Sequence, residues 1–138
     1  MNEKLKQASE YFESGRCCSQ SVFGVFCEKY GLDEKTALKI SCGFGSGVRC
    51  ADICGAVSGA VLAIGLKYGD NKEKCNLKTE EFIKLFRGKN KEIICRNILG
   101  CDVSTPEGKA KAINENLFKT VCVDMVVSAT QILCDLGY

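Results

Sequence analysis

The chain contains no histidine and no tryptophan, and only one of its 138 residues is a proline. Without histidine there is no imidazole general base, no Ser-His or Cys-His nucleophile pair and no His-ligated metal site. Any catalysis or metal coordination must therefore depend on thiols, carboxylates, lysines and tyrosines.

The sequence also lacks an excess of charge of either sign. There are 19 Lys and Arg residues and 17 Asp and Glu residues, which gives a net charge of +2. Because no dominant positive field is available to neutralise a phosphate backbone, we expect no nucleic-acid partner. The length and the 46% hydrophobic content are ordinary for one globular domain, which we expect to span residues 1–138.

Targeting and membrane-spanning signals are missing as well. The first seven residues are charged and alternating, without the apolar run and cleavage site of a secretory signal, so we expect a cytoplasmic protein. The longest apolar run, residues 51–66, is shorter than the roughly twenty residues that a membrane span needs. We therefore expect no membrane span.

Apolar residues recur at helical spacing in nearly every segment, which predicts an all-α fold. We expect a compact bundle of about six helices around a buried, Gly/Ala-rich central helix at 51–66, in which Gly55, Gly59 and Ala63 share one face. The spacing and capping residues predict helices over approximately 2–14, 17–30, 34–41, 51–66, 79–86, 93–99 and 106–135. Glycine within the 51–66 helix indicates that another backbone packs closely against it.

Cysteine is the abundant residue, with 11 in the chain. None of them forms a Cys-x-x-Cys pair, which excludes a thioredoxin-type motif and the knuckles of a zinc ribbon. In a reducing cytosol most of these thiols should be free, metal-bound or transiently oxidised. A thiol site must therefore be built from cysteines on separate helices.

Cys54 is the best single candidate for chemistry. It falls in the first turn of the predicted 51–66 helix, where unpaired N–H groups and the helix dipole stabilise a thiolate. We therefore predict that Cys54 is the most acidic thiol of the candidate site. The alternative is that Cys54 is a small buried hydrophobic residue, as free cysteines often are.

The segment Cys54-Gly55-Ala56-Val57-Ser58-Gly59 and the ten residues after it resemble a family of redox-active proteins. That family is named for one Cys, then a Cys-Gly-Ala-x-x-Gly motif, then two further Cys. The glycine-rich segment 43–47 also fits the family. Its first cysteine corresponds to Cys18, and its last two correspond to Cys95 and Cys122. Cys17 and Cys50 depart from the family's pattern.

The resemblance implies a small, mainly helical protein with redox activity. Because Cys18, Cys54, Cys95 and Cys122 belong to four predicted helices, we expect them to converge in one all-sulfur site. Such a site suits an iron-sulfur cluster or zinc, and the redox description favours iron-sulfur because zinc has no redox chemistry. Cys54 and Cys18 are the candidate catalytic residues, and electrons would pass to a redox partner protein.

Other interpretations stay open at this stage. Two of the thiols could cycle between dithiol and disulfide without a metal, with Cys17 beside Cys18 or Cys50 one turn from Cys54 as resolving thiols. The chain could also be a cysteine-rich binding module without chemistry, and a homodimer is compatible with the sequence. The spacing Gly43-x-Gly45-x-Gly47 lacks a preceding strand, so it predicts a turn that allows close packing near Cys54 rather than a phosphate loop.

Overall fold

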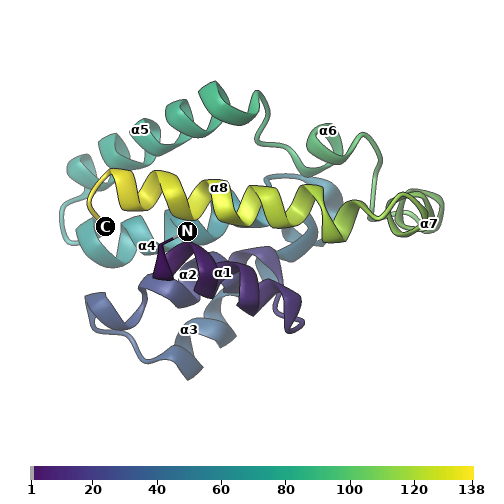
Figure 1. Ribbon diagram of the computed structural model, residues 1–138. Coiled ribbons are helices and arrows are strands. Elements are labelled where there is room, and N and C mark those ends of the chain that lie inside the picture. Colours follow the sequence, from purple (N-terminus) through teal and green to yellow (C-terminus); the bar gives the residue numbers. More distant parts are fainter. Residues whose placement is uncertain (1) are drawn as a thin grey trace.

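The computed structural model describes residues 2–138 as helices and connecting turns (Figure 1). These residues form eight α-helices: α1 Glu3–Glu13, α2 Cys18–Phe26, α3 Glu34–Ser41, α4 Gly55–Tyr68, α5 Lys72–Asn90, α6 Cys95–Leu99, α7 Pro106–Asn114 and α8 Val121–Asp135. Within the described part of the chain the β-type pairing is limited to one isolated bridge, between Ile53 and Ile94. The predicted all-α class is confirmed, with eight helices instead of about six.

Helix α5 is more than twice as long as predicted, with 19 residues instead of the eight at 79–86. Its N-cap is Asn71, whose side-chain oxygen accepts a hydrogen bond from the Lys74 N–H at 3.1 Å. Only Phe82 and Phe86 are buried in this helix. The first half therefore carries little of the apolar periodicity on which the prediction depended.

The predicted single helix over 106–135 is wrong, because two helices occupy this region. The start is as predicted: Pro106 is the first helical residue and the Thr105 hydroxyl accepts a hydrogen bond from the Gly108 N–H at 3.0 Å. The chain then turns at Asn116, which has a left-handed φ of 60°. Asparagine tolerates this conformation better than most residues, so it can end α7 before α8 begins.

Helix α4 packs closely against α2 through two glycines. A Cβ atom on Gly59 would lie 2.5 Å from the backbone oxygen of Ser19, and one on Gly55 would lie 3.0 Å from the Cβ of Cys18. A Cβ on Gly65 would meet nothing within 4 Å. The predicted close approach is therefore found at Gly55 and Gly59 and not at Gly65.

The turn before α4 explains why this helix begins at Gly55 and not at residue 51. Ser46, Val48, Arg49 and Ala51 all have left-handed φ values. Cβ atoms on Gly45 and Gly47 would collide with Cys17 and with the backbone of Asp52. The glycine-rich segment is thus a tightly packed turn, as the spacing predicted.

The apolar side chains form two cores. The main core joins α1, α2, α4, α5 and α8, and its largest fully buried side chains include Phe26, Phe82 and Phe86. A smaller core joins Ala51, α6, the segment before α7 and α7. Cys18 and Cys54 belong with the main core, whereas Cys95 and Cys122 belong with the smaller one. The four cysteines of the predicted site thus come from both sides of this boundary.

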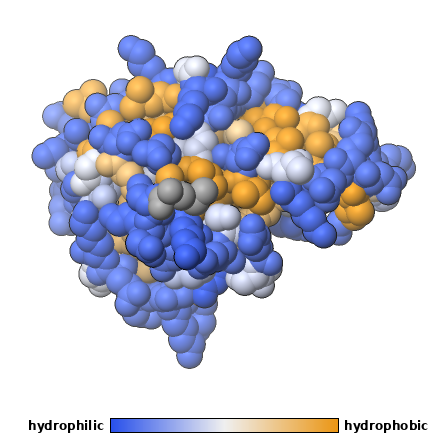
Figure 2. All heavy atoms as spheres, viewed as in Figure 1, coloured by the Kyte–Doolittle hydropathy of each residue, from blue (hydrophilic) through white to orange (hydrophobic). Residues whose placement is uncertain are grey.

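The two chain ends lie close together, and the Lys4 ammonium donates a hydrogen bond to the Tyr138 backbone oxygen at 3.2 Å (Figure 1). Figure 2 shows apolar side chains gathered on the face that α8 crosses, with hydrophilic residues around them. By length and composition alone, Leu117–Asp135 could cross a membrane. Of its apolar stretch, 33% is buried inside the protein. A buried core helix meets the same criterion, so this segment is weak evidence for a span.

Candidate redox site

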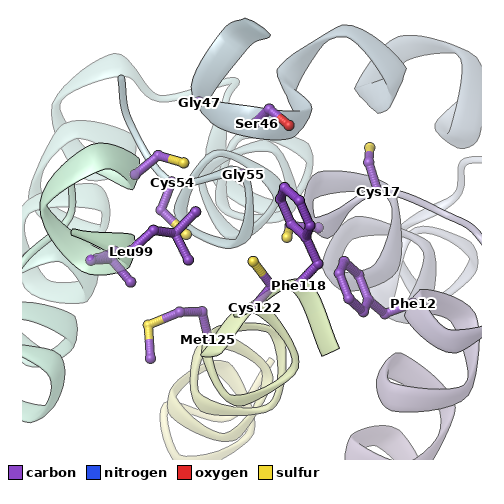
Figure 3. A pocket seen from close by; sticks show the side chains of 13 residues that line it. Phe12, Cys17, Ser46, Gly47, Cys54, Gly55, Leu99, Phe118, Cys122 and Met125 are labelled. Atoms are coloured by element: carbon purple, nitrogen blue, oxygen red, sulfur yellow. The ribbon is translucent and has the colours of Figure 1, made fainter. Parts of the chain in front are cut away.

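The four predicted site cysteines line one cavity of about 120 Å³. Figure 3 shows Cys54 and Cys122 around this space together with Leu99, Phe118 and Met125. The full lining is Phe12, Cys17, Cys18, Ser46, Gly47, Cys54, Gly55, Cys95, Ile98, Leu99, Phe118, Cys122 and Met125. The structure therefore brings together the four cysteines and adds Cys17, and the rest of the wall is mainly apolar.

Each of the four cysteines stands at the beginning of a helix. Cys18 and Cys95 are the first residues of α2 and α6, Cys54 is the N-cap of α4, and Cys122 is the second residue of α8. The first N–H groups of a helix have no partner within the helix, and they favour negative charge nearby. The sequence identified this placement for Cys54 alone.

A short backbone pairing places Cys54 and Cys95 on the same wall of the cavity. The Cys54 N–H donates to the Ile93 oxygen at 2.7 Å, and the Cys95 N–H donates to the Asp52 oxygen at 2.7 Å. These two bonds flank the bridge between residues 53 and 94. The pairing joins the start of α4 to the start of α6 although 41 positions separate them.

Cys18 is held in place from two directions. On one side its Cβ lies against Gly55. A Cβ atom at position 55 would be only 3.0 Å from it, so a larger residue there would crowd Cys18. On the other side the buried hydroxyl of Ser19 donates to the Ser41 oxygen at 2.7 Å and so ties α2 to α3. Both contacts fix the start of α2 against the cavity.

Cys18 and Cys122 form an interacting thiol pair. A side-chain hydrogen bond with Cys122, followed by burial, raises the pKa of Cys18 well above its ordinary value of 9.0. The same hydrogen bond lowers the pKa of Cys122, although burial opposes this effect. The two directions differ because a hydrogen bond between two thiols favours the charged form of the sulfur that accepts it.

The prediction that Cys54 is the most acidic of the four thiols is wrong. Burial raises the pKa of Cys54 to about 11, even though the nearby backbone N–H groups of Ala56 and Val57 act to lower the pKa. Burial likewise raises the pKa of Cys95 to about 12, with a smaller contribution from neighbouring Cys54. Desolvation thus outweighs the helix terminus at Cys54, and both thiols are neutral at pH 7.

Cys17 and Cys50, which depart from the family's pattern, lie in different surroundings. The Cys17 sulfur lies 3.1 Å from the Ser19 hydroxyl and 3.6 Å from the Cys42 oxygen, at the edge of the cavity. Cys50 is exposed in the left-handed turn, where its thiol donates to the Gly47 oxygen at 3.3 Å. Because α4 begins at Gly55, Cys50 is not one helical turn from Cys54.

The donors present agree only in part with a metal centre. An all-sulfur set without nitrogen ligands is the kind that binds zinc or iron-sulfur clusters. However, among residues 2–138 no group of three or more Cys, Asp or Glu side chains is arranged to hold a metal ion. The four thiols are thus of a chemical type that binds metals, but they are not placed around one common position.

The comparison with protein families bears directly on this cluster. The model of the family described as "Putative redox-active protein (C_GCAxxG_C_C)" matches residues 16–136. The chain belongs to this family. The match includes all the cavity cysteines, and the family description names redox activity without a reaction. A search of curated proteins and a search of solved structures found no match.

One detail of the family pattern differs from this chain. The family name orders the motif Gly-Cys-Ala-x-x-Gly, whereas this chain has Cys54-Gly55-Ala56-x-x-Gly59. The glycine after the cysteine has a clear structural role here, because position 55 faces Cys18 and the backbone of Ser19. The chain therefore needs glycine at 55 to bring Cys18 and Cys54 to one cavity.

Proposed function

We propose that this protein is a thiol-disulfide redox protein whose working pair is Cys18 and Cys122. The observation that carries the proposal is that both cysteines line one cavity, where their interaction shifts their pKa values in opposite directions. A low-pKa thiol beside a second thiol is the arrangement that thiol-disulfide exchange requires. The family's redox description agrees with this chemistry.

The reaction that we propose transfers two electrons to a disulfide RSSR. The Cys122 thiolate attacks one sulfur of RSSR, the S–S bond breaks, and RS⁻ leaves and takes a proton. Cys18 then loses its proton to solvent and attacks the Cys122 sulfur, which releases the second RS⁻. The products are a Cys18–Cys122 disulfide and two RSH molecules.

Cys54 has a supporting role in this proposal and does not act as the nucleophile. Its thiol and that of Cys95 remain protonated at neutral pH, because burial disfavours their charged forms. Together with the apolar wall they surround the pair with groups of low polarity. Cys122 is the nucleophile in this proposal because its pKa is lowered.

Counting thiols under a controlled redox buffer tests the proposal. The reduced protein should lose two thiols per chain as the buffer becomes oxidising, in one two-electron transition. Cys18→Ala and Cys122→Ala should each abolish that transition, whereas Cys42→Ala, which changes an exposed thiol outside the cavity, should leave it intact. Retention of the transition in the Cys122→Ala variant would refute the assigned pair.

A second candidate is a cysteine-bound cofactor, an iron-sulfur cluster that transfers electrons or a zinc ion. The observation that favours it is the convergence of Cys18, Cys54, Cys95 and Cys122 on one cavity. A bound iron-sulfur cluster would supply one-electron chemistry, and zinc would supply a structural link. Visible absorbance and metal analysis of protein purified without oxygen separate the candidates. A colourless, metal-free preparation supports the thiol pair, and a stoichiometric metal supports the cofactor.

A further inference from the structure

A second hollow lies against the thiol cavity and shares two aromatic side chains with it. This groove has a volume of about 370 Å³ and is lined by Phe12, Glu13, Phe118, Lys119 and Val123. Phe12 and Phe118 also line the thiol cavity. The two rings therefore border both hollows, and Figure 3 shows both near Cys122.

The charged side chains of the groove are exposed and have opposite signs. Glu13 lies at the end of α1, and Lys119 lies in the short helical turn Leu117–Lys119 before α8. The ion pairs found among residues 2–138 join Arg16 to Glu34 and Lys78 to Glu81, and neither includes these two residues. Glu13 accepts one long hydrogen bond, from the Ser9 hydroxyl at 3.5 Å. Both charges are thus available to a ligand.

Helix α8 contributes neighbouring residues to the groove and to the thiol cavity. Val123 lines the groove, while its chain neighbour Cys122 lines the thiol cavity. Phe12 and Phe118 thus border both the groove and the cavity that Cys122 lines. Both phenylalanines are only partly buried.

We propose that this groove binds a small zwitterionic disulfide, of the class formed by two amino acids joined through their sulfur atoms. This inference rests on the proposed function and names its electron acceptor. The ammonium group of the ligand would pair with Glu13, its carboxylate with Lys119, and its disulfide would lie over the apolar wall. A volume of about 370 Å³ falls within the usual range for small-molecule sites.

The phenylalanine pair acts as the gate between ligand and thiolate. The rings of Phe12 and Phe118 part to admit the disulfide, and the Cys122 thiolate attacks the nearer sulfur. One amino-acid thiol leaves through the groove, and attack by Cys18 on Cys122 releases the second. Two thiols of the protein are oxidised and one ligand disulfide is reduced, so the electrons balance.

Four small disulfides that differ in charge test the ligand class. We use cystine as the zwitterion, cystamine as the cation, dithiodipropionate as the anion and hydroxyethyl disulfide as the neutral compound. The measured quantity is the second-order rate constant for oxidation of the reduced protein at low ionic strength. Cystine should react fastest, and added salt should reduce its advantage because exposed charges are screened.

Charge variants make the prediction specific to the groove. Glu13→Lys and Lys119→Glu should each slow cystine about two- to fivefold, as expected for one exposed ion pair. Glu13→Lys makes the groove more positive and should raise the rate constant with the anion dithiodipropionate. Lys119→Glu makes it more negative and should raise the rate constant with the cation cystamine. Neither variant should change the rate constant with the neutral disulfide by much. Glu10→Lys, on α1 and outside the groove lining, serves as the matched control.

The outcomes separate this inference from the proposed function. If no disulfide oxidises Cys18 and Cys122, the proposed function fails and the groove has no substrate. If hydroxyethyl disulfide oxidises the pair but cystine has no charge-dependent advantage, only the present inference is overturned. A protein disulfide that reacts faster than cystine and is insensitive to both charge variants would also overturn it.

The gate has its own measurement. Phe118→Ala should speed the reaction of Cys122 with a bulky maleimide more than its reaction with small iodoacetamide, because only the bulky reagent needs the opening. Phe118→Leu keeps most of the apolar volume, so its labelling rates should lie between those of the unaltered protein and of Phe118→Ala. This variant controls for a general loss of folding. Equal acceleration of both reagents would contradict a gate.

Discussion

Neighbouring groups decide the acidity of the cavity thiols more strongly than helix position does. Cys54 precedes the first N–H groups of α4, and its pKa still rises to about 11 because it is buried. Cys122 also starts a helix, but a thiol of Cys18 bonds its sulfur and lowers its pKa. The neighbouring thiol therefore lowers the pKa of Cys122 despite burial, whereas burial prevails at Cys54.

Removing the donor should make Cys122 less acidic. In the Cys18→Ala variant the pKa of Cys122 should rise towards or above 9.0, because burial is then no longer opposed by the hydrogen bond. The pH dependence of iodoacetamide labelling at Cys122, followed by mass spectrometry, measures this shift. Cys17→Ala is the matched control, because Cys17 lines the same cavity without bonding Cys122. An unchanged profile in Cys18→Ala would contradict the pairing.

At the scale of the helices, the site depends on the close contact of α2 with α4. Gly55 and Gly59 lie against Cys18 and Ser19, so the backbone of α4 approaches the start of α2 more closely than any side chain would allow. This contact brings Cys18 to the wall that carries Cys54. Glycine in a helix is unfavourable, and its presence here is explained by that approach.

Two alanine substitutions in α4 should have opposite effects on stability. Gly59→Ala should destabilise the fold by about 1 to 3 kcal/mol, because its methyl group would lie 2.5 Å from the Ser19 oxygen. Gly65→Ala should stabilise it by up to about 1 kcal/mol, since its methyl group meets nothing and alanine favours the helix. Urea denaturation of both variants measures the difference. Equal effects would show that α4 does not pack against α2 in this way.

The helices that could be predicted from the sequence are those with local signals. The run at 51–66 gave a helix with glycines on its packing face, and Pro106 marked the start of α7. Helix α5 was mostly missed because only two of its residues are buried, so its sequence carries a capping signal and little periodicity. The break between α7 and α8 depends on the left-handed conformation of one residue, Asn116, and no glycine or proline beside it marks the break in the sequence.

The convergence of the four cysteines was predictable, whereas their electrostatics were not. The family pattern identified four cysteines, and the structure places all four around one cavity. The pairing of Cys18 with Cys122 depends on packing between α2 and α8, which lie far apart in sequence. Burial at Cys54 depends on the segment around Cys95 and on the main core, so its pKa could not be derived from the start of one helix.

At the scale of the whole molecule, the cavity joins the main core to the smaller one. Residues of both cores line it, including Cys54 from the first and Cys95 from the second. Ionisation of a thiol at this boundary would place a charge between two apolar clusters. The stability of the fold should therefore depend on pH in the range where these thiols titrate.

The free energy of unfolding should fall as the pH rises above about 9. Cys54 ionises near 9.0 when exposed in the unfolded chain and near 11 in the folded protein, so the unfolded chain loses its proton first. The contribution of the neutral Cys54 thiol to the free energy of unfolding is fully present below pH 9. It is lost as the pH rises through 11, by up to about 2 to 3 kcal/mol. Urea denaturation at pH 8 and pH 10.5 measures the loss. Cys54→Ser should reduce the loss and Cys42→Ser should not, whereas equal losses in all three proteins would contradict the assignment.

The most direct test of the central claim is to identify the disulfide that forms first. The fully reduced protein is oxidised with one equivalent of a small disulfide, free thiols are blocked with N-ethylmaleimide, and the digested peptides are examined by mass spectrometry. The account predicts a link between the peptide that contains Cys18 and the peptide that contains Cys122. A first disulfide that joins other cysteines, or the absence of any intramolecular disulfide, would contradict it.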